Sequence, residues 1–116
     1  MNQPFSITQH QPTPRITVLR LRGNLDAAGA QDLVLRASAA RAAGSDVVIA
    51  LAQVSFIASS GVGAVLALAE EFRLDGRSLR IASPSPPVDS VLRLLNLAPF
   101  LDIDVDEATS VNRLAA

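Results

Sequence analysis

Cysteine and lysine are both absent from this sequence of 116 residues. Without cysteine there is no disulfide, no thiolate metal ligand and no cysteine nucleophile. Without lysine there is neither a P-loop lysine nor Schiff-base chemistry. Tryptophan and tyrosine are missing as well, and the aromatic fraction is 3%. The core must therefore consist of aliphatic side chains, and little is left for stacking nucleobases or sugars.

The sequence also lacks an excess of charge of either sign, because 10 basic residues face 11 acidic ones and the net charge is −1. Its arginines are scattered, and only Arg15, Arg20 and Arg22 approach a cluster. A nucleic-acid-binding protein normally presents a basic face, so we expect no nucleic-acid partner. A signal peptide has a basic segment followed by an apolar core, and the N-terminus shows no such pattern. No apolar run is long enough to span a bilayer. We expect a cytoplasmic protein that does not insert into a membrane.

Hydrophobic residues make up 49% of the chain, and its length suits a single domain over residues 1–116. Short aliphatic runs alternate with longer amphipathic ones, and turn residues separate them at 11–14 and 23–26. Strands are expected at residues 5–8, 15–22, 47–51, 79–81 and 101–105. Helices are expected at residues 28–43, from 60 or 61 to 74, from the proline-rich segment 83–87 to a point before Pro99, and at 107–114.

This alternation predicts an α/β fold with a mixed, mostly parallel sheet of four to five strands, an N-terminal antiparallel hairpin and about four helices. In the second strand, Ile16 and Val18 share one face while Leu19 and Leu21 share the other. That pattern indicates a strand covered on both sides. Residues 47–51 are apolar throughout, which is typical of a central strand buried on both faces.

The segment Ser59-Ser60-Gly61 joins the central strand to an amphipathic helix. Taken alone, the serine pair predicts a helix N-cap, because serine is among the best residues to satisfy the free N–H groups there. The alternative is a phosphoacceptor. A phosphate at this point would lie where the N–H groups and the helix dipole favour negative charge.

Three aspartates alternate near the C-terminus, at Asp102, Asp104 and Asp106. A calcium loop would need a glycine and a final glutamate at fixed positions, and both are missing. A solvated strand edge accounts for the aspartates, and Asp104 with Glu107 resembles a capping box for the last helix. Arg80 is interpreted as a surface residue.

The sequence gives little support for catalysis. Gly61 and Gly63 begin like a dinucleotide fingerprint, but its third glycine would fall at Leu66. A nucleophile elbow requires Gly-x-Ser-x-Gly, which the serine segment lacks. The single histidine, His10, belongs to no acid–base–nucleophile set. We therefore expect no catalytic residues, no metal and no cofactor; an enzyme or small-ligand binder that uses the serine loop is the alternative.

Two motifs in combination resemble the STAS family, the sulfate transporter and anti-sigma factor antagonist domains. Residues 21–26, Leu-Arg-Gly-Asn-Leu-Asp, resemble the Gly-Glu-Leu-Asp turn of that family. Residues 56–63, Phe-Ile-Ala-Ser-Ser-Gly-Val-Gly, resemble its Phe-Ile-Asp-Ser-Ser-Gly-Leu-Gly signature. Residues 91–97 followed by Phe100 resemble its late helix and loop, so the resemblance covers nearly the whole chain.

The resemblance implies an anti-sigma factor antagonist. Such a protein binds an anti-sigma factor that is also a serine kinase of the histidine-kinase-like ATPase superfamily, and this binding releases the sigma factor. Phosphorylation ends the interaction and a phosphatase restores it. Carried over to this sequence, the phosphorylated residue is Ser59. The partner-binding residues are Asp26, Ala58, Ser59, Ser60 and Gly61.

The sequence departs from the family pattern at three positions. Ala58 replaces the aspartate that usually precedes the serine, Ala50 replaces an aspartate of the central strand, and Asn24 replaces the acid of the earlier turn. These changes remove acidic groups that could organise the loop or engage a kinase. Ala58 adds support to the alternative of a non-switching scaffold, such as a stressosome component or the STAS subunit of a lipid-transport ABC complex, whereas the intact serine pair keeps the antagonist as the main expectation.

Overall fold

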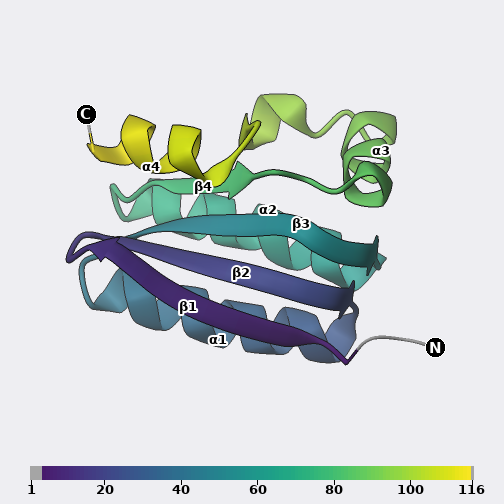
Figure 1. Ribbon diagram of the computed structural model, residues 1–116, viewed down its shortest axis with the longest axis horizontal. Coiled ribbons are helices and arrows are strands. Elements are labelled where there is room, and N and C mark those ends of the chain that lie inside the picture. Colours follow the sequence, from purple (N-terminus) through teal and green to yellow (C-terminus); the bar gives the residue numbers. More distant parts are fainter. Residues whose placement is uncertain (1–3, 116) are drawn as a thin grey trace.

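The structure, a computed structural model, describes residues 4–115, which form one five-stranded sheet with strand order β1-β2-β3-β4-β5 (Figure 1). The strands are β1 (Ser6–Thr13), β2 (Ile16–Leu25), β3 (Asp46–Ile57), β4 (Leu79–Ala82) and β5 (Asp102–Asp104). The helices are α1 (Ala27–Ala42), α2 (Ser59–Leu74), α3 (Pro86–Leu94), the short 3-10 helix η1 (Ala98–Phe100) and α4 (Glu107–Ala115). β1 pairs with β2 antiparallel and the other pairs are parallel, which confirms the expected fold class.

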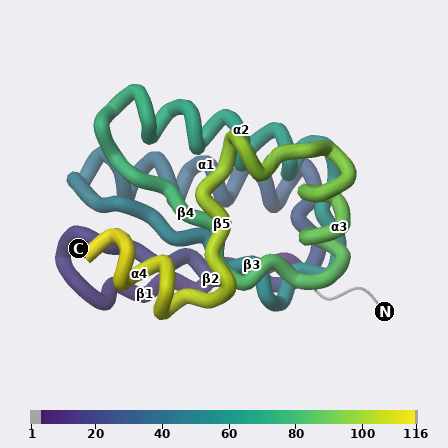
Figure 2. The backbone as a smooth tube through the Cα atoms, turned by 90° about the horizontal axis from the view of Figure 1, so that it is seen from above, coloured from purple at the N-terminus to yellow at the C-terminus, as the bar shows by residue number. Residues whose placement is uncertain are grey.

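The helices divide between the two faces of the sheet. Figure 2 shows α1 and α2 side by side on one face and α4 on the other. The larger core lies under α1, α2 and α3, and the fully buried ring of Phe72 is its largest side chain. A smaller apolar cluster around Val18 and Val48 packs under Val111 and Leu114 of α4. In residues 4–115, no helix combines the length and the apolar character needed to cross a bilayer.

The alternation within β2 is confirmed, because Leu19 and Leu21 belong to the larger core and Ile16 and Val18 to the smaller cluster. β3 is buried on both faces from Val47 to Leu51, as its continuous apolar run predicts. These two strands form the longest parallel pair of the sheet, and helices pack against both of their faces.

Three predicted strand ends were wrong. β1 runs through Pro12, which is tolerated because β1 is an edge strand that needs no ladder hydrogen bond on its outer side. β2 continues through Gly23 to Leu25, and the pairing shifts register at Gly23, whose φ is +95°. A glycine at a bulge signals a bend in a strand as well as its end, so composition alone misplaced this boundary. β3 likewise runs on to Ile57.

The interpretation of Asp104 and Arg80 was also wrong. Asp104 is 5% exposed. Its carboxylate accepts hydrogen bonds from Arg80 Nε at 2.6 Å and from Ser110 Oγ at 2.6 Å, and Arg113 Nε lies 3.1 Å away. The cap of α4 is instead Asp106, whose Oδ1 accepts from the backbone N–H of Thr109 at 2.8 Å. Asp104 therefore ties α4 to β4 and β5 across the small face of the sheet.

Replacing this carboxylate tests its contribution to stability. We expect Asp104→Asn to lower the free energy of unfolding by about 3 kcal/mol, because it removes the buried carboxylate that accepts two hydrogen bonds from the largely buried Arg80 guanidinium. Asp102→Asn is the matched control: Asp102 is exposed and lies 3.8 Å from Arg80, so its loss should change stability by less than about 0.5 kcal/mol. Urea denaturation measures both, and equal losses would contradict the assignment.

The same pair predicts a pH dependence. Hydrogen bonding from Arg80 holds the pKa of the Asp104 carboxyl below its ordinary value of 3.8, and Ser110 acts in the same direction against the opposing effect of burial. Because the folded pKa is lowered, the stabilisation is fully present above pH 3.8 and is lost as the pH falls toward the folded pKa. The stability difference between wild type and Asp104→Asn should therefore shrink below that pH.

Candidate functional site

The candidate site lies where β2 and β3 end together. Asn24 pairs with Phe56 and Leu25 with Ile57 in parallel register, and the backbone N–H of Ala58 donates to the carbonyl of Leu25 at 3.0 Å. α1 and α2 begin directly after these strand ends. Two motifs more than thirty positions apart in the sequence are thus brought together, as the resemblance implied.

Asp26 has a structural function at this site. Its Oδ1 accepts a hydrogen bond from the backbone N–H of Gly29 at 3.0 Å, and its own carbonyl accepts from Ala30 N–H at 2.8 Å. It is the N-cap of α1, and its side chain remains exposed to solvent. The carboxylate therefore anchors α1 and contributes negative charge to the surface, whereas its contact with a partner stays a prediction.

The start of α2 differs from the expectation drawn from the serine pair alone. Ala58 is the N-cap residue, and no side chain among residues 4–115 caps the helix there. Ser59 and Ser60 are the first two residues of α2, and both are exposed. The interpretation of either serine as the N-cap was therefore wrong. Both hydroxyls stay accessible because neither is committed to capping.

The position of Ser59 and Ser60 favours an added negative charge. The first N–H groups of a helix have no carbonyl partner within it, and the aligned peptide dipoles make this end positive. The first turn of α2 carries no acidic residue that would already neutralise it. A phosphate on Ser59 would therefore be compatible with the helix, and backbone N–H groups could hydrogen bond to it.

Gly61 allows α2 to begin this close to β2. A Cβ at this position would lie 2.7 Å from the carbonyl oxygen of Leu25 and 2.9 Å from its Cγ. Both distances are well inside van der Waals contact, and the first atom is backbone and is held in the sheet. Gly61 is itself buried, and its close packing fixes where the two preceding serines lie, whereas its contact with a partner stays a prediction.

A groove between α1 and α2 starts at Ser60. Its lining is mostly small and apolar: Ala27, Ala30, Gln31, Val34, Leu35, Ser60 and Ala64. Leu35 is 71% exposed, and on the strand that leads into the site Phe56 is 55% exposed. Sequence reasoning missed these two residues. Leu35 does not fall on the buried stripe of α1 formed by Leu33, Ala37 and Ala40. A leucine off this stripe could have been recognised from the sequence as an exposed apolar residue.

Comparison with known proteins identifies the family of this fold. The STAS domain model matches residues 8–110. This chain belongs to the STAS domain family. Among curated proteins, none matches the sequence.

The solved structures that resemble this STAS domain include anti-sigma factor antagonists. The antagonist SpoIIAA in its unphosphorylated form is 26% identical, with a TM-score of 0.79 over 95% of this chain and 96% of that one. The phosphorylated form of SpoIIAA, a Bacillus cell fate determinant, is 25% identical, with a TM-score of 0.72 over 93% and 98%. An anti-sigma factor antagonist from Mycobacterium paratuberculosis, 17% identical, has a TM-score of 0.86 over 97% and 96%, which shows likeness of fold alone.

The close packing at Gly61 yields a prediction with an internal control. We expect Gly61→Ala to destabilise the STAS domain by about 1–3 kcal/mol, because the added methyl forces α2 away from the Leu25 carbonyl. Gly63→Ala, two residues later in the same helix, should instead stabilise it by roughly 0.5–1 kcal/mol, since a Cβ there meets no described atom within 4 Å. Thermal and urea unfolding of both variants measure the effect. A neutral Gly61→Ala would refute the packing argument.

Proposed function

We propose that this STAS domain is an anti-sigma factor antagonist that binds an anti-sigma factor through the surface formed by Asp26, Ala58, Ser59 and Ser60. The main support is that Ser59 stands exposed and uncommitted in the first turn of α2, beside the apolar groove between α1 and α2. An apolar groove provides area for a protein partner. The adjoining hydroxyls provide a position at which charge can be added.

Phosphorylation of Ser59 would then act as the switch. A phosphoserine carries roughly −1.5 to −2 charges at pH 7. The fold accepts this charge at the start of α2, for the reasons given above. A partner packed against Ala58 and the groove would have to desolvate it, so binding weakens without a large conformational change.

This proposal defines the partners by their chemistry. The kinase is the anti-sigma factor itself, a member of the histidine-kinase-like ATPase superfamily, and a phosphatase removes the phosphate from Ser59. The STAS domain supplies a docking surface and a phosphoacceptor, and it catalyses no reaction. Such a role belongs in the cytoplasm.

One observation favours the second candidate, a scaffold subunit without a switch. Ala58 provides no side-chain cap and no carboxylate beside Ser59, and the carboxylate of Asp26 is already bonded to the N–H of Gly29. A kinase would find no free acid in this loop to orient the serine hydroxyl. Binding would then persist regardless of ATP.

Incubation with the partner kinase and ATP tests the switch. We expect one phosphate by intact-mass analysis, mapped to Ser59, abolished in Ser59→Ala and retained in Ser60→Ala. Both substitutions should leave the melting temperature nearly unchanged, because neither hydroxyl caps α2. Binding of the partner without any incorporated phosphate would refute the switch and support the scaffold.

A parallel pull-down tests the partner surface. Ser59→Asp should weaken capture of the anti-sigma factor by tenfold or more while the domain stays folded, since an acidic residue is favourable in the first turn. Asn112→Asp is the control, because it adds the same charge to an exposed position of α4 on the opposite face of the sheet. Equal effects of the two substitutions would contradict the proposed surface.

Restoring the family aspartate gives a separate prediction. Ala58→Asp should raise the free energy of unfolding by about 1 kcal/mol, because aspartate at the N-cap accepts from the N–H groups that Ala58 leaves without a side-chain partner. If the missing acid limits phosphorylation, incorporation at Ser59 should also increase. A gain in stability with unchanged incorporation would limit the aspartate to a capping function.

A further inference from the structure

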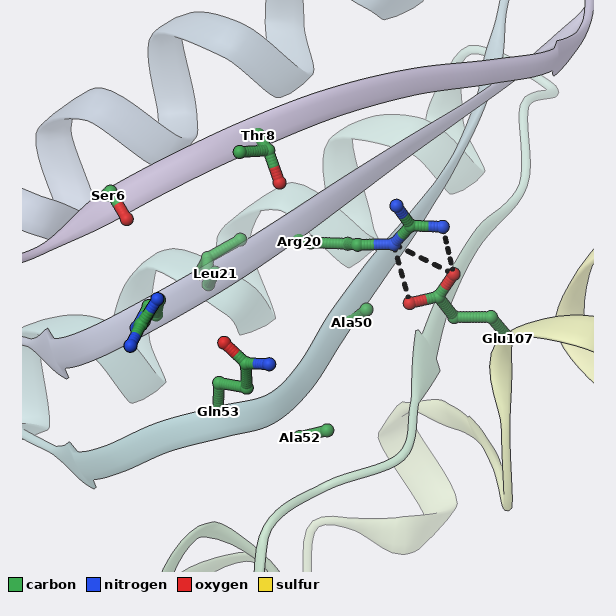
Figure 3. A pocket seen from close by; sticks show the side chains of 9 residues that line it. Ser6, Thr8, Arg20, Leu21, Ala50, Ala52, Gln53 and Glu107 are labelled. Atoms are coloured by element: carbon green, nitrogen blue, oxygen red, sulfur yellow. Dashed lines mark hydrogen bonds and ion pairs between the residues drawn. The ribbon is translucent and has the colours of Figure 1, made fainter.

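A polar pocket lies on the face of the sheet opposite α1 and α2, on its open part beside α4 (Figure 3). Its volume is about 230 Å³. Ala50 and Ala52 of β3 line it, and their short side chains leave room between the longer ones. Figure 3 shows Ser6 and Thr8 on β1, Arg20 on β2 and Gln53 on β3 around this space, with Glu107 reaching Arg20 from α4.

The pocket is rich in hydrogen-bond donors and carries a formal charge of +1, because Arg20 and Arg22 outnumber Glu107. This differs from the chain as a whole, whose net charge is −1. Two hydroxyls and the amide of Gln53 add further donors. Such a lining is complementary to an anion.

One carboxylate already occupies part of this site. Both oxygens of Glu107 accept from Arg20, with Nε–Oε1 at 3.0 Å, Nε–Oε2 at 2.9 Å and Nη2–Oε1 at 2.9 Å. This two-pronged geometry is the one by which guanidinium groups recognise carboxylates and phosphates. Arg22 makes no ion pair within 4.0 Å to any residue of the described range 4–115. The guanidinium group of Arg22 is therefore available to a ligand in the pocket.

We propose that this pocket binds a small molecule through a carboxylate or phosphate group, with Arg22, Gln53 and the hydroxyls of Ser6 and Thr8 as donors and Glu107 as a built-in competitor. The volume lies below the roughly 300–1,000 Å³ of pockets for drug-sized ligands, which limits the ligand to a small anion. The site lies on the face of the sheet away from the α1–α2 groove. Ligand binding here is therefore independent of the function proposed for Ser59.

The experiment is a ligand titration of the uniformly ¹⁵N-labelled domain, in which NMR monitors the amide chemical shifts. Inorganic phosphate and succinate are the two probes, each added at constant ionic strength with chloride as the balancing ion. We expect saturable shifts at Arg22, Gln53 and Thr8 for at least one probe. Phosphate alone would identify a phosphate-bearing ligand, and succinate alone a carboxylate.

Three variants make the test specific. Arg22→Gln should weaken binding about tenfold, because it removes the open charged donor. Arg15→Gln makes the same change of charge at an exposed position in the same hairpin outside the pocket, and it should leave binding unchanged. Glu107→Gln should tighten binding by roughly threefold to tenfold, because Arg20 then loses its internal carboxylate.

The proposal is overturned if neither probe produces saturable shifts in the pocket amides, or if Arg22→Gln binds as tightly as wild type. Unchanged affinity in Glu107→Gln would remove Glu107 from the role of competitor. None of these results bears on partner capture or on phosphate incorporation at Ser59, so the two proposals succeed or fail separately.

Discussion

The contact between the start of α2 and the end of β2 is the constraint on which the arrangement of the site depends. β2 and β3 stay paired to Leu25 and Ile57, and Ala58 N–H donates to the Leu25 carbonyl as the chain leaves the sheet. With no side chain at Gly61, the helix can begin directly against that carbonyl. Because Asp26 directly follows β2 and Ala58 directly follows β3, the same contact brings the cap of α1 and the exposed serines of α2 together. The site is thus a consequence of backbone packing as well as of its side chains.

The two faces of the sheet are stabilised differently. Under α1, α2 and α3 the core is mainly aliphatic with Phe72 as its one fully buried aromatic ring, and the buried hydroxyls of Thr17 and Ser45 hydrogen bond to each other at 2.8 Å. Under α4 the apolar cluster is small, and the helix depends also on Asp104 and its bonds to Arg80 and Ser110. A short helix on a small apolar cluster leaves part of the sheet open. That open part is the surface on which the Arg20–Glu107 pair and the polar pocket lie.

Much of the fold was predictable because it follows from periodicity. The continuous apolar run of β3 and the two-sided apolar pattern of β2 predicted that these strands lie at the centre of the sheet. Gly44 and Gly76, both at positive φ, follow the ends of α1 and α2 and marked the ends of these helices. The ends of β1, β2 and β3 were not predictable in this way. A glycine at a bulge, or a proline on an edge strand, reads as a break in the sequence although the strand continues through it.

By itself, the sequence determined which residues belong to the candidate site, since the two motifs single out residues 21–26 and 56–63 before any fold is known. Only the tertiary structure decided what several of these residues do. Neither Ser59 nor Ser60 caps α2, because Ala58 is the N-cap residue; a helix that began one residue later would have Ser59 as its N-cap. Asp104 was assigned to solvent from its alternation with Asp102 and Asp106, yet it is buried against Arg80. That ion pair joins positions 24 residues apart, and no local pattern encodes a contact that exists only after β4 and β5 have paired.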